Sequence, residues 1–168
     1  MTIAGRAVTL KEDNVNTDVL YPGEFLNIED PDQMRAHLFE GIDPGLRDEL
    51  GPGTILVVGE NFGTGSSREH VPLAMEASGV SCLIGKSFAR IFRRNCLNLG
   101  LPLVDCPDAV NSAEPGVSIE VDLDGGTVAV ESERFDIAPM PDFMRQMLDA
   151  GGLVPWLRGR SDDAASAR

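Results

Sequence analysis

The first half of the chain alternates between strand-like and helix-like patterns of hydrophobic residues. Residues 3–10 alternate apolar and polar side chains, which is typical of a strand with one buried face. Residues 54–58 and 81–84 are short apolar runs of the kind found in strands buried on both faces. Residues 68–78 lie between these two runs and contain helix-forming residues. The order strand, helix, strand predicts a crossover between two parallel strands.

Two further segments of this half predict helices. A helix is expected to begin after Asp30, a capping residue followed by proline, and to run to about Glu40. Residues 87–97 predict an amphipathic helix, since its apolar residues share one face: Phe88, Ile91, Phe92 and Cys96. Residues 13–18 and 43–53 are expected to form loops, the second with a short helical excursion.

The second half of the chain predicts mainly strands. Residues 117–123, 127–130 and 134–137 alternate apolar and polar positions and are separated by turn-forming residues, so they predict an antiparallel meander. Residues 142–150 predict a helix that ends at a glycine pair. Residues 159–168 are small and polar and predict a disordered tail.

This order of elements predicts an α/β fold, a single layered β/β/α domain over residues 1–158 followed by the tail. A chain of 168 residues, 42% apolar and 24% charged, is long enough to bury one substantial core. Its 14 basic and 27 acidic residues give a net charge of −13, which disfavours binding to nucleic acid or to anionic membranes. No apolar run approaches the roughly 20 residues that cross a bilayer, so a cytoplasmic protein is expected.

The positions of the cysteines argue against a metal site on this chain. Cys82, Cys96 and Cys106 fall in a predicted strand, a predicted helix and a loop, without the close pairs that bind zinc or an iron–sulfur cluster. An odd number of cysteines also disfavours a disulfide framework. All three are expected to be reduced structural thiols, and no metal site is expected on this chain.

The most informative segment is residues 59–70, GENFGTGSSREH, which place two serines and an arginine on a glycine-rich turn between a strand and a helix. Glycines allow the backbone to turn sharply and to approach a ligand closely. The first turn of the next helix offers unpaired N–H groups and the positive end of its dipole. This arrangement favours an anion.

Standard nucleotide and hydrolase motifs do not fit this segment. It lacks the last glycine of a dinucleotide-binding fingerprint, and neither serine has the following glycine of a nucleophile elbow. Gly85, Lys86 and Ser87 imitate the end of a P-loop, but Gly79 is one residue too far away. A helix-capping role for Ser66 or Ser67 remains an alternative at this point.

A resemblance to a known family depends on several motifs in the same order. The chain resembles the swivelling domain of the aconitase superfamily, and within it the small-subunit family of the 3-isopropylmalate and homoaconitate dehydratases. The resemblance extends from about residue 3 to about residue 155. It is carried by residues 14–18 (NVNTD), 40–44 (EGIDP), 59–70 (GENFGTGSSREH), 86–92 (KSFARIF) and 95–102 (NCLNLGLP).

The resemblance implies roles for four residues. Enzymes of this family remove a proton next to a carboxylate and expel hydroxide from a hydroxy dicarboxylic acid, so they need a strong base and a stabilised carbanion. Ser66 matches the catalytic serine that acts as an alkoxide, and Arg68 matches the arginine that binds a substrate carboxylate. Ser67 matches an auxiliary hydroxyl that bonds the substrate. Asp18 matches an aspartate that reaches a histidine of the partner, with an Asx-turn as its alternative role.

The resemblance also implies a partner and a cofactor. A large subunit would carry the hydroxide-accepting 4Fe-4S cluster, and this chain would bind none. The expected enzyme is a two-subunit hydro-lyase that isomerises 3-isopropylmalate and 2-isopropylmalate in leucine biosynthesis. His70 is expected to be a helix residue near the site rather than an acid or base, and His37 has still less to support a role.

Substrate choice is where the chain departs from the family pattern. Asn27 and Ile28 occupy positions that in relatives discriminate the distal group of the substrate, by arginine for an extra carboxylate or by an apolar residue for an isopropyl group. Asn27 is neither an arginine nor an apolar residue. Glu24 also departs from the family pattern, since a basic residue is common at its position. Asn27 is expected to bond a small polar substituent or to cap the turn at Asp30. Isopropylmalate and methylated malates therefore both remain open, and homoaconitate is a further alternative that an uncompensated buried carboxylate disfavours.

Two other classes of function remain as alternatives. The chain could be a noncatalytic anion-binding module of the same fold, although a binder would not need the serine base. It could also be a self-sufficient, cofactor-independent lyase, but the sequence offers no acid to protonate the leaving hydroxide.

Overall fold

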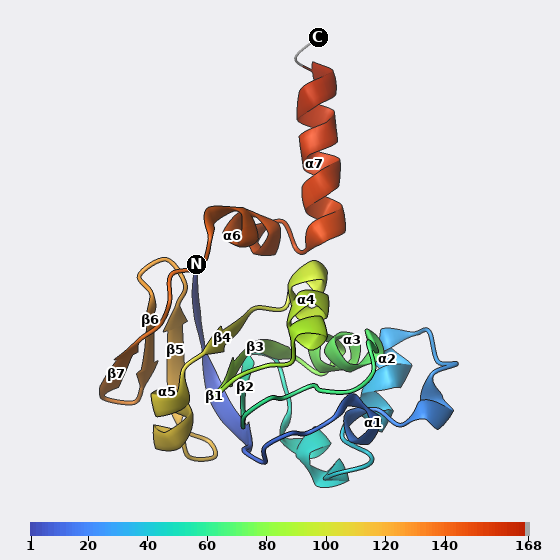
Figure 1. Ribbon diagram of the computed structural model, residues 1–168, viewed down its shortest axis with the longest axis vertical. Coiled ribbons are helices and arrows are strands. Elements are labelled where there is room, and N and C mark those ends of the chain that lie inside the picture. The colour runs from blue at the N-terminus through green and yellow to red at the C-terminus, as the bar shows by residue number, and fades with distance from the viewer. Residues whose placement is uncertain (167–168) are drawn as a thin grey trace.

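The computed structural model describes residues 1–166 and shows one mixed seven-stranded sheet in the order β4-β3-β2-β1-β5-β6-β7 (Figure 1). Strands β1 to β4 pair in parallel, and β1, β5, β6 and β7 pair in antiparallel. The strands are β1 (Thr2–Leu10), β2 (Thr54–Val58), β3 (Val80–Gly85), β4 (Leu103–Asp105), β5 (Ser118–Asp122), β6 (Thr127–Val130) and β7 (Glu133–Asp136).

Strand β1 belongs to both parts of the sheet. Its first half pairs antiparallel with β5, with Gly5 opposite Ile119, and its second half pairs parallel with β2, with Ala7 opposite Ile55. Strand β1 therefore lies between β5 and β2 in the sheet. Gly5 allows the backbone just before β2 to approach β1 closely, because a Cβ there would lie 1.8 Å from the carbonyl oxygen of Gly53. The sheet curls at β1, and the meander β5–β7 turns out of the plane of the parallel strands (Figure 1).

The helices connect and cover the parallel strands. Figure 1 shows α1 to α4 on one side of the molecule, α5 beside the meander, and α7 projecting away from the body. Among the described residues, no helix combines the length and apolar character that crossing a membrane requires. The helices are α1 (Thr17–Leu20), α2 (Pro31–Met34), α3 (His70–Ala77), α4 (Arg90–Leu99), α5 (Pro107–Ser112), α6 (Asp142–Asp149) and α7 (Leu153–Ser166), with 3₁₀ turns at Gly23–Phe25, Arg35–His37 and Pro44–Glu49.

Two hydrophobic clusters form the core, one on each face of the parallel strands. Alternate residues of β2 enter different clusters, because successive side chains of a strand point to opposite faces. Leu56 and Val58 pack with α1 to α4, and Ile55 and Val57 pack with α5, α6 and the meander. The layers are thus meander, parallel strands and helices, which confirms the predicted α/β fold.

The strand predictions were the most accurate. Residues 54–58 form β2 as predicted, and each segment of the meander lies within about a residue of its prediction. The helix predicted from Pro31 to Glu40 was too long, since α2 ends at Met34. Phe39 explains the early end: it is fully buried with φ +62°, and its N–H donates to the carbonyl of Leu20 at 2.7 Å. The chain must leave the helix to bring Phe39 back onto α1.

The C-terminal segment differs from the predicted disordered tail. Helix α7 continues through residues 159–166, where the sequence predicted a tail. Contacts between residues four apart support the helix: the Arg160 guanidinium lies 4.9 Å from the Trp156 ring centroid, and the Ser161 hydroxyl donates to the carbonyl of Leu157 at 3.0 Å. Residues 167 and 168 lie outside the described residues, and the domain limit at residue 158 stays a prediction.

The glycine-rich turn after β2 packs directly against α4. Gly63 and Gly65 have φ of +79° and +96°, a left-handed region that disfavours other residues. A Cβ on Gly63 would lie 2.2 Å from Cγ of Phe92, whose side chain is only 2% exposed. The turn therefore depends on the absence of a side chain at residue 63.

We expect Gly63→Ala to lower the free energy of unfolding of the isolated chain by about 2–4 kcal/mol, because it adds backbone strain to overpacking. Urea unfolding measures this loss. Gly51→Ala is the matched control, because a Cβ there would have no neighbour within 4 Å. Equal stability of the two variants would contradict this account of the turn.

The three cysteines are buried free thiols. Burial raises the pKa of Cys82 to about 12, and it also raises the pKa of Cys96 and Cys106. The reactive species is the thiolate, so these groups stay protonated and unreactive when the chain is folded.

We expect a chromogenic disulfide reagent at about pH 8 to modify the native chain slowly and all three thiols rapidly in guanidinium. Rapid modification of Cys82 in the native chain would show that the strand is accessible.

Candidate active site

Hydrogen bonds join the glycine-rich turn to the N-terminal loop. The N–H of Gly63 donates to the carbonyl of Val15 at 2.8 Å, and the N–H of Thr17 donates to the carbonyl of Thr64 at 2.9 Å. The buried Thr17 hydroxyl also donates to the carbonyl of Ser66 at 3.1 Å. These bonds place the beginning of α1 beside the two serines.

The structure holds the backbone of the serines and leaves both residues exposed. The buried Asn95 in α4 donates from Nδ2 to the carbonyl of Ser67 at 3.2 Å. Helix α3 begins at His70, and its N-cap is Glu69, which makes no side-chain capping bond. The alternative that a serine caps this helix is therefore wrong. The turn ends just before the first free N–H groups of α3.

Arg68 and Asp18 come together at this turn. The Arg68 Nη1 atom lies 2.7 Å from Asp18 Oδ1 and donates to the carbonyl of Tyr21 at 3.0 Å. The Arg68 side chain is 17% exposed and that of Asp18 is 62% exposed. The Nε atom of Arg68 is buried without a hydrogen-bond partner among the described residues. An unpaired buried donor is costly, so a ligand oxygen that accepted from Nε would be stabilising.

Asn16, and not Asp18, caps the first turn of α1, so the Asp18 carboxylate can pair with Arg68. Asn16 caps α1, because its Oδ1 accepts from the N–H groups of Asp18 and Val19 at 2.9 and 3.1 Å. Asn16 thus makes the Asx-type turn that was the alternative role for Asp18. The predicted contact of Asp18 with a histidine of the partner stays a prediction.

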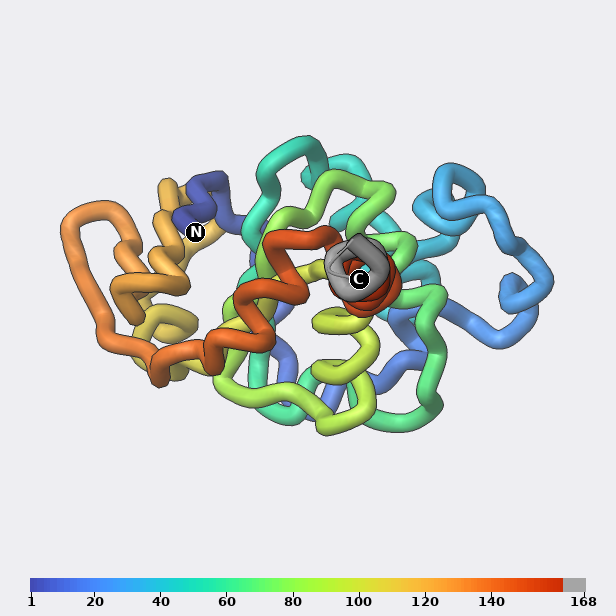
Figure 2. Tube along the Cα trace, turned by 90° about the horizontal axis from the view of Figure 1, so that it is seen from above, coloured from blue at the N-terminus to red at the C-terminus, as the bar shows by residue number. Residues whose placement is uncertain are grey.

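Asn27 and Ile28 lie on a loop that projects from the body on the side opposite to the meander (Figure 2, blue, about residues 20–35). Asn27 is exposed, and Ile28 is partly buried against the helical cluster. Asp30 caps α2 with its own side chain, which accepts from the N–H of Asp32 at 3.0 Å. Asn27 is therefore not the helix cap, and its contact with a substrate stays a prediction.

Two aromatic contacts fasten this loop to the rest of the chain. His70, the first residue of α3, stacks on Tyr21 with ring centroids 5.4 Å apart, and its Nε2 lies 3.1 Å from the carbonyl oxygen of Leu26. His37 stacks on Phe25 at 3.8 Å. His70 lies near the site as predicted, but its contact with the loop was not predicted.

The cysteines of this chain do not fit an iron–sulfur cluster. Cys82 lies in β3, Cys96 in α4 and Cys106 at the start of α5, and each is buried in the core. A cluster needs several thiolates that face one point. Within residues 1–166, no group of three or more His, Cys, Asp or Glu residues could hold a metal ion.

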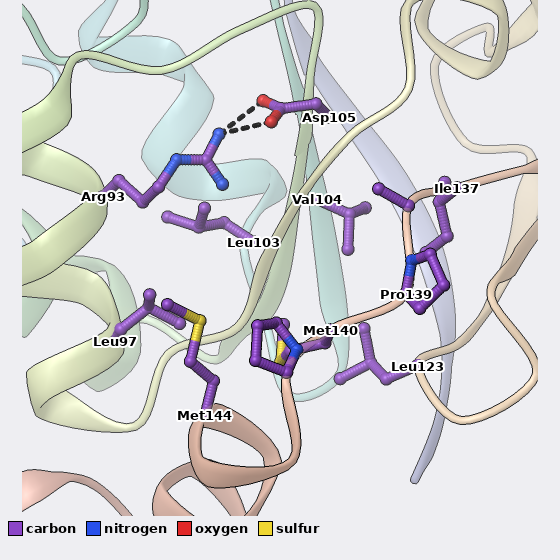
Figure 3. A pocket seen from close by; sticks show the side chains of 12 residues that line it. Arg93, Leu97, Leu103, Val104, Asp105, Leu123, Ile137, Pro139, Met140 and Met144 are labelled. Carbon is purple, nitrogen blue, oxygen red and sulfur yellow. Dashed lines mark hydrogen bonds and ion pairs between the residues drawn. The ribbon is translucent and has the colours of Figure 1, made fainter.

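The candidate residues do not line the partly open cavity shown in Figure 3. That cavity, of about 190 Å³, lies between α4, β4 and the segment leading into α6, and the Arg93–Asp105 ion pair borders it. Its lining contains none of the six candidate residues. The serines instead lie on an open surface, where another chain could cover them.

Sequence reasoning missed the residues that support the turn from below. Thr17 and Asn95 are buried polar residues whose side chains donate to the backbone at the serines. Both occur in the motifs that carry the family resemblance. A polar side chain on the apolar face of the 87–97 helix was the available signal for Asn95.

Comparisons with known proteins agree with this geometry. A family model, the aconitase C-terminal domain, matches residues 49–107, which contain the glycine-rich turn. The 3-isopropylmalate dehydratase small subunit of Halothermothrix orenii is 44% identical over 161 residues, covering 95% of this chain and 97% of that protein. The 2,3-dimethylmalate dehydratase small subunit of Eubacterium barkeri is 47% identical over 147 residues, covering 86% and 90%.

A solved structure is also similar over its whole length. The crystal structure of 3-isopropylmalate dehydratase from Methanocaldococcus jannaschii superposes with a TM-score of 0.90 at 35% identity and covers 100% of both chains. Sequence identity and fold thus agree over nearly the full chain. The chain belongs to the aconitase superfamily and, within it, to the family of 3-isopropylmalate dehydratase small subunits.

Proposed function

We propose that this chain is the small subunit of a two-subunit hydro-lyase that interconverts 3-isopropylmalate and 2-isopropylmalate in leucine biosynthesis. The observation that carries the proposal is the convergence of Ser66, Ser67, Arg68 and Asp18 at one exposed turn. This turn lies within the part of the chain that matches the aconitase C-terminal domain.

In this proposal Ser66 removes the proton next to a substrate carboxylate. A serine hydroxyl is a very weak acid, so its alkoxide must be stabilised by nearby positive charge and N–H donors. The beginning of α3 follows Ser66 in the chain, and Arg68 lies two residues away. The bond from Thr17 to the carbonyl of Ser66 fixes the backbone that carries the hydroxyl. Ser67 supplies a second hydroxyl that bonds the substrate.

Arg68 binds a substrate carboxylate through its planar fork. Its Nη1 atom is engaged by Asp18 and Tyr21, whereas the buried Nε still lacks a partner among the described residues. A carboxylate that accepted from Nε and Nη2 would satisfy that donor and leave Nη1 paired with Asp18. Asp18, whose side chain is 62% exposed, is proposed to orient a histidine of the large subunit.

We further propose that the large subunit holds the 4Fe-4S cluster that the aconitase superfamily implies. The separated, buried thiols of this chain support that assignment, because they cannot converge on a cluster. Three free cysteines are also expected of a reducing compartment, so we place the complex in the cytoplasm.

Asn27 and Ile28 are proposed to contact the distal group of the substrate. Ile28 supplies an apolar surface, which suits an isopropyl group, and the neighbouring Asn27 is polar and exposed. The relative from E. barkeri has a name that specifies 2,3-dimethylmalate. A methylated malate is therefore the second substrate to test.

We expect isomerase activity only when the chain is co-expressed with a large subunit, and we expect Ser66→Ala to lower kcat of the complex by at least about 100-fold. Removal of the base leaves substrate binding largely intact, so KM should change little. Ser118→Ala, an exposed serine in β5, is the control. Full activity of the lone chain would refute the subunit assignment, and full activity of the Ser66→Ala complex would refute the role of Ser66 as the base.

We expect Asn27→Arg to lower kcat/KM for 3-isopropylmalate by about 10-fold, and to raise it for a substrate with a third carboxylate in place of the alkyl group. The ratio of the two kcat/KM values measures the change. Glu24→Arg, also exposed in this loop, controls for added charge alone. An unchanged ratio in Asn27→Arg would show that the loop does not contact the distal group.

A further inference from the structure

The loop that carries Asn27 is attached to the same turn that carries Arg68. Arg68 donates to the carbonyl of Tyr21 at 3.0 Å, where the loop begins. The Tyr21 hydroxyl donates to the carbonyl of Phe25 at 3.1 Å and so closes the first part of the loop on itself. The next carbonyl, that of Leu26, lies 3.1 Å from Nε2 of His70. Two residues of one short segment, Arg68 and His70, thus hold both ends of the stretch that precedes Asn27.

The contact with Leu26 determines the protonation of the His70 ring. A carbonyl oxygen only accepts hydrogen bonds, so Nε2 of His70 must carry the proton. The geometry leaves one consistent neutral form of the ring, the Nε2–H tautomer. The stack on Tyr21, at 5.4 Å and an interplanar angle of 30°, fixes the plane of the ring and aims Nε2 at the loop.

We infer that His70 is a positioning residue for substrate specificity, which through its bond to Leu26 sets where Asn27 and Ile28 stand relative to Arg68. Arg68 holds one end of the substrate, so this distance decides how well the distal group fits. His70 does not touch the reacting atoms in this role. The substrate named in this inference rests on the proposed function, whereas the contact between His70 and the loop does not.

The two contacts of His70 can be separated by substitution. His70→Phe keeps an aromatic ring on Tyr21 and removes the donor to Leu26. His70→Gln removes the ring and keeps an amide donor near the Nε2 position. His37→Phe is the matched control, because His37 also stacks on an aromatic ring of this loop, that of Phe25.

The first experiment measures kcat and KM of the co-expressed complex with isopropyl- and methyl-substituted malates. We expect His70→Phe to raise KM for the isopropyl substrate about 3- to 10-fold, with kcat and the methyl substrate changed less than about 2-fold. His70→Gln should restore KM to within about 2-fold of the unmodified complex, and His37→Phe should leave it there. Four results would each overturn the inference. In His70→Phe they are a fall in kcat, an equal rise in KM for both substrates, or an unchanged KM for the isopropyl substrate. In His70→Gln it is a KM that stays raised.

The second experiment tests the geometry without activity. Long-range ¹H–¹⁵N spectra of the isolated chain show two imidazoles, since the chain has two histidines, and His37→Phe assigns them. We expect the Nε2–H tautomer for His70, and amide shifts confined to the loop around Asn27 in His70→Phe. An Nδ1–H tautomer, or unchanged loop amides, would refute the inference even if the isomerase is confirmed. An inactive unmodified complex together with these spectral results would refute the proposed function and leave the positioning contact supported.

Discussion

The hydrogen bonds between the N-terminal loop and the glycine-rich turn are the constraint on which the site depends. Residues 15–17 and 63–66 belong to loops that follow different strands, β1 and β2, and these strands pair in parallel. Parallel neighbours end at the same edge of a sheet, so the two loops meet there. Bonds from Gly63 and Thr17 then fix one loop on the other, which brings Asp18 within reach of Arg68.

The charge of the chain makes this local arrangement necessary. A net charge of −13 repels a dicarboxylate at long range, so binding of the proposed substrate would depend on a guanidinium held in place at short range. The Arg68 side chain is largely buried and is fixed by the carbonyl of Tyr21 as well as by Asp18. Loss of the Asp18 contact therefore does not release the side chain. The Asp18 side chain is 62% exposed, so water weakens its pairing with Arg68. Asp18 can therefore orient the guanidinium while the proposed substrate carboxylate binds the Nε and Nη2 edge.

The sequence predicted those parts of the molecule that depend on local patterns. The apolar runs predicted β2 and β3, and the turn residues predicted the meander, because burial on one or two faces leaves a period in the sequence. Strand β4 has three residues, and the six-residue α5 follows Cys106, which is not a capping residue, so neither gave a signal. The early end of α2 depends on the tertiary bond from Phe39 to Leu20, which no local pattern contains.

The site shows the same difference between features set by a local pattern and features set by tertiary contacts. The sequence suggested the proposed chemistry of Ser66, Ser67 and Arg68, because these residues are adjacent in one motif. The pairing of Asp18 with Arg68 required two distant motifs to meet, and the family resemblance indicated that both belong to one site. The supports from Thr17, Asn95 and His70 were not predicted, because each acts through a backbone carbonyl. A carbonyl acceptor is common to all residues, so the sequence at the accepting position carries no trace of the bond.

The exposure of the serines explains why a partner is required for the proposed chemistry. Both serines face solvent in this chain, where water screens the groups that would stabilise an alkoxide. The interaction of an alkoxide with Arg68 and the N–H groups of α3 is weak in a high dielectric and grows several-fold when water is excluded. A large subunit that covers the turn would therefore strengthen the base without moving any residue of this chain. On this argument the small subunit holds a preorganised but inactive half of the site, and closure by the partner supplies the dielectric in which Ser66 becomes a base.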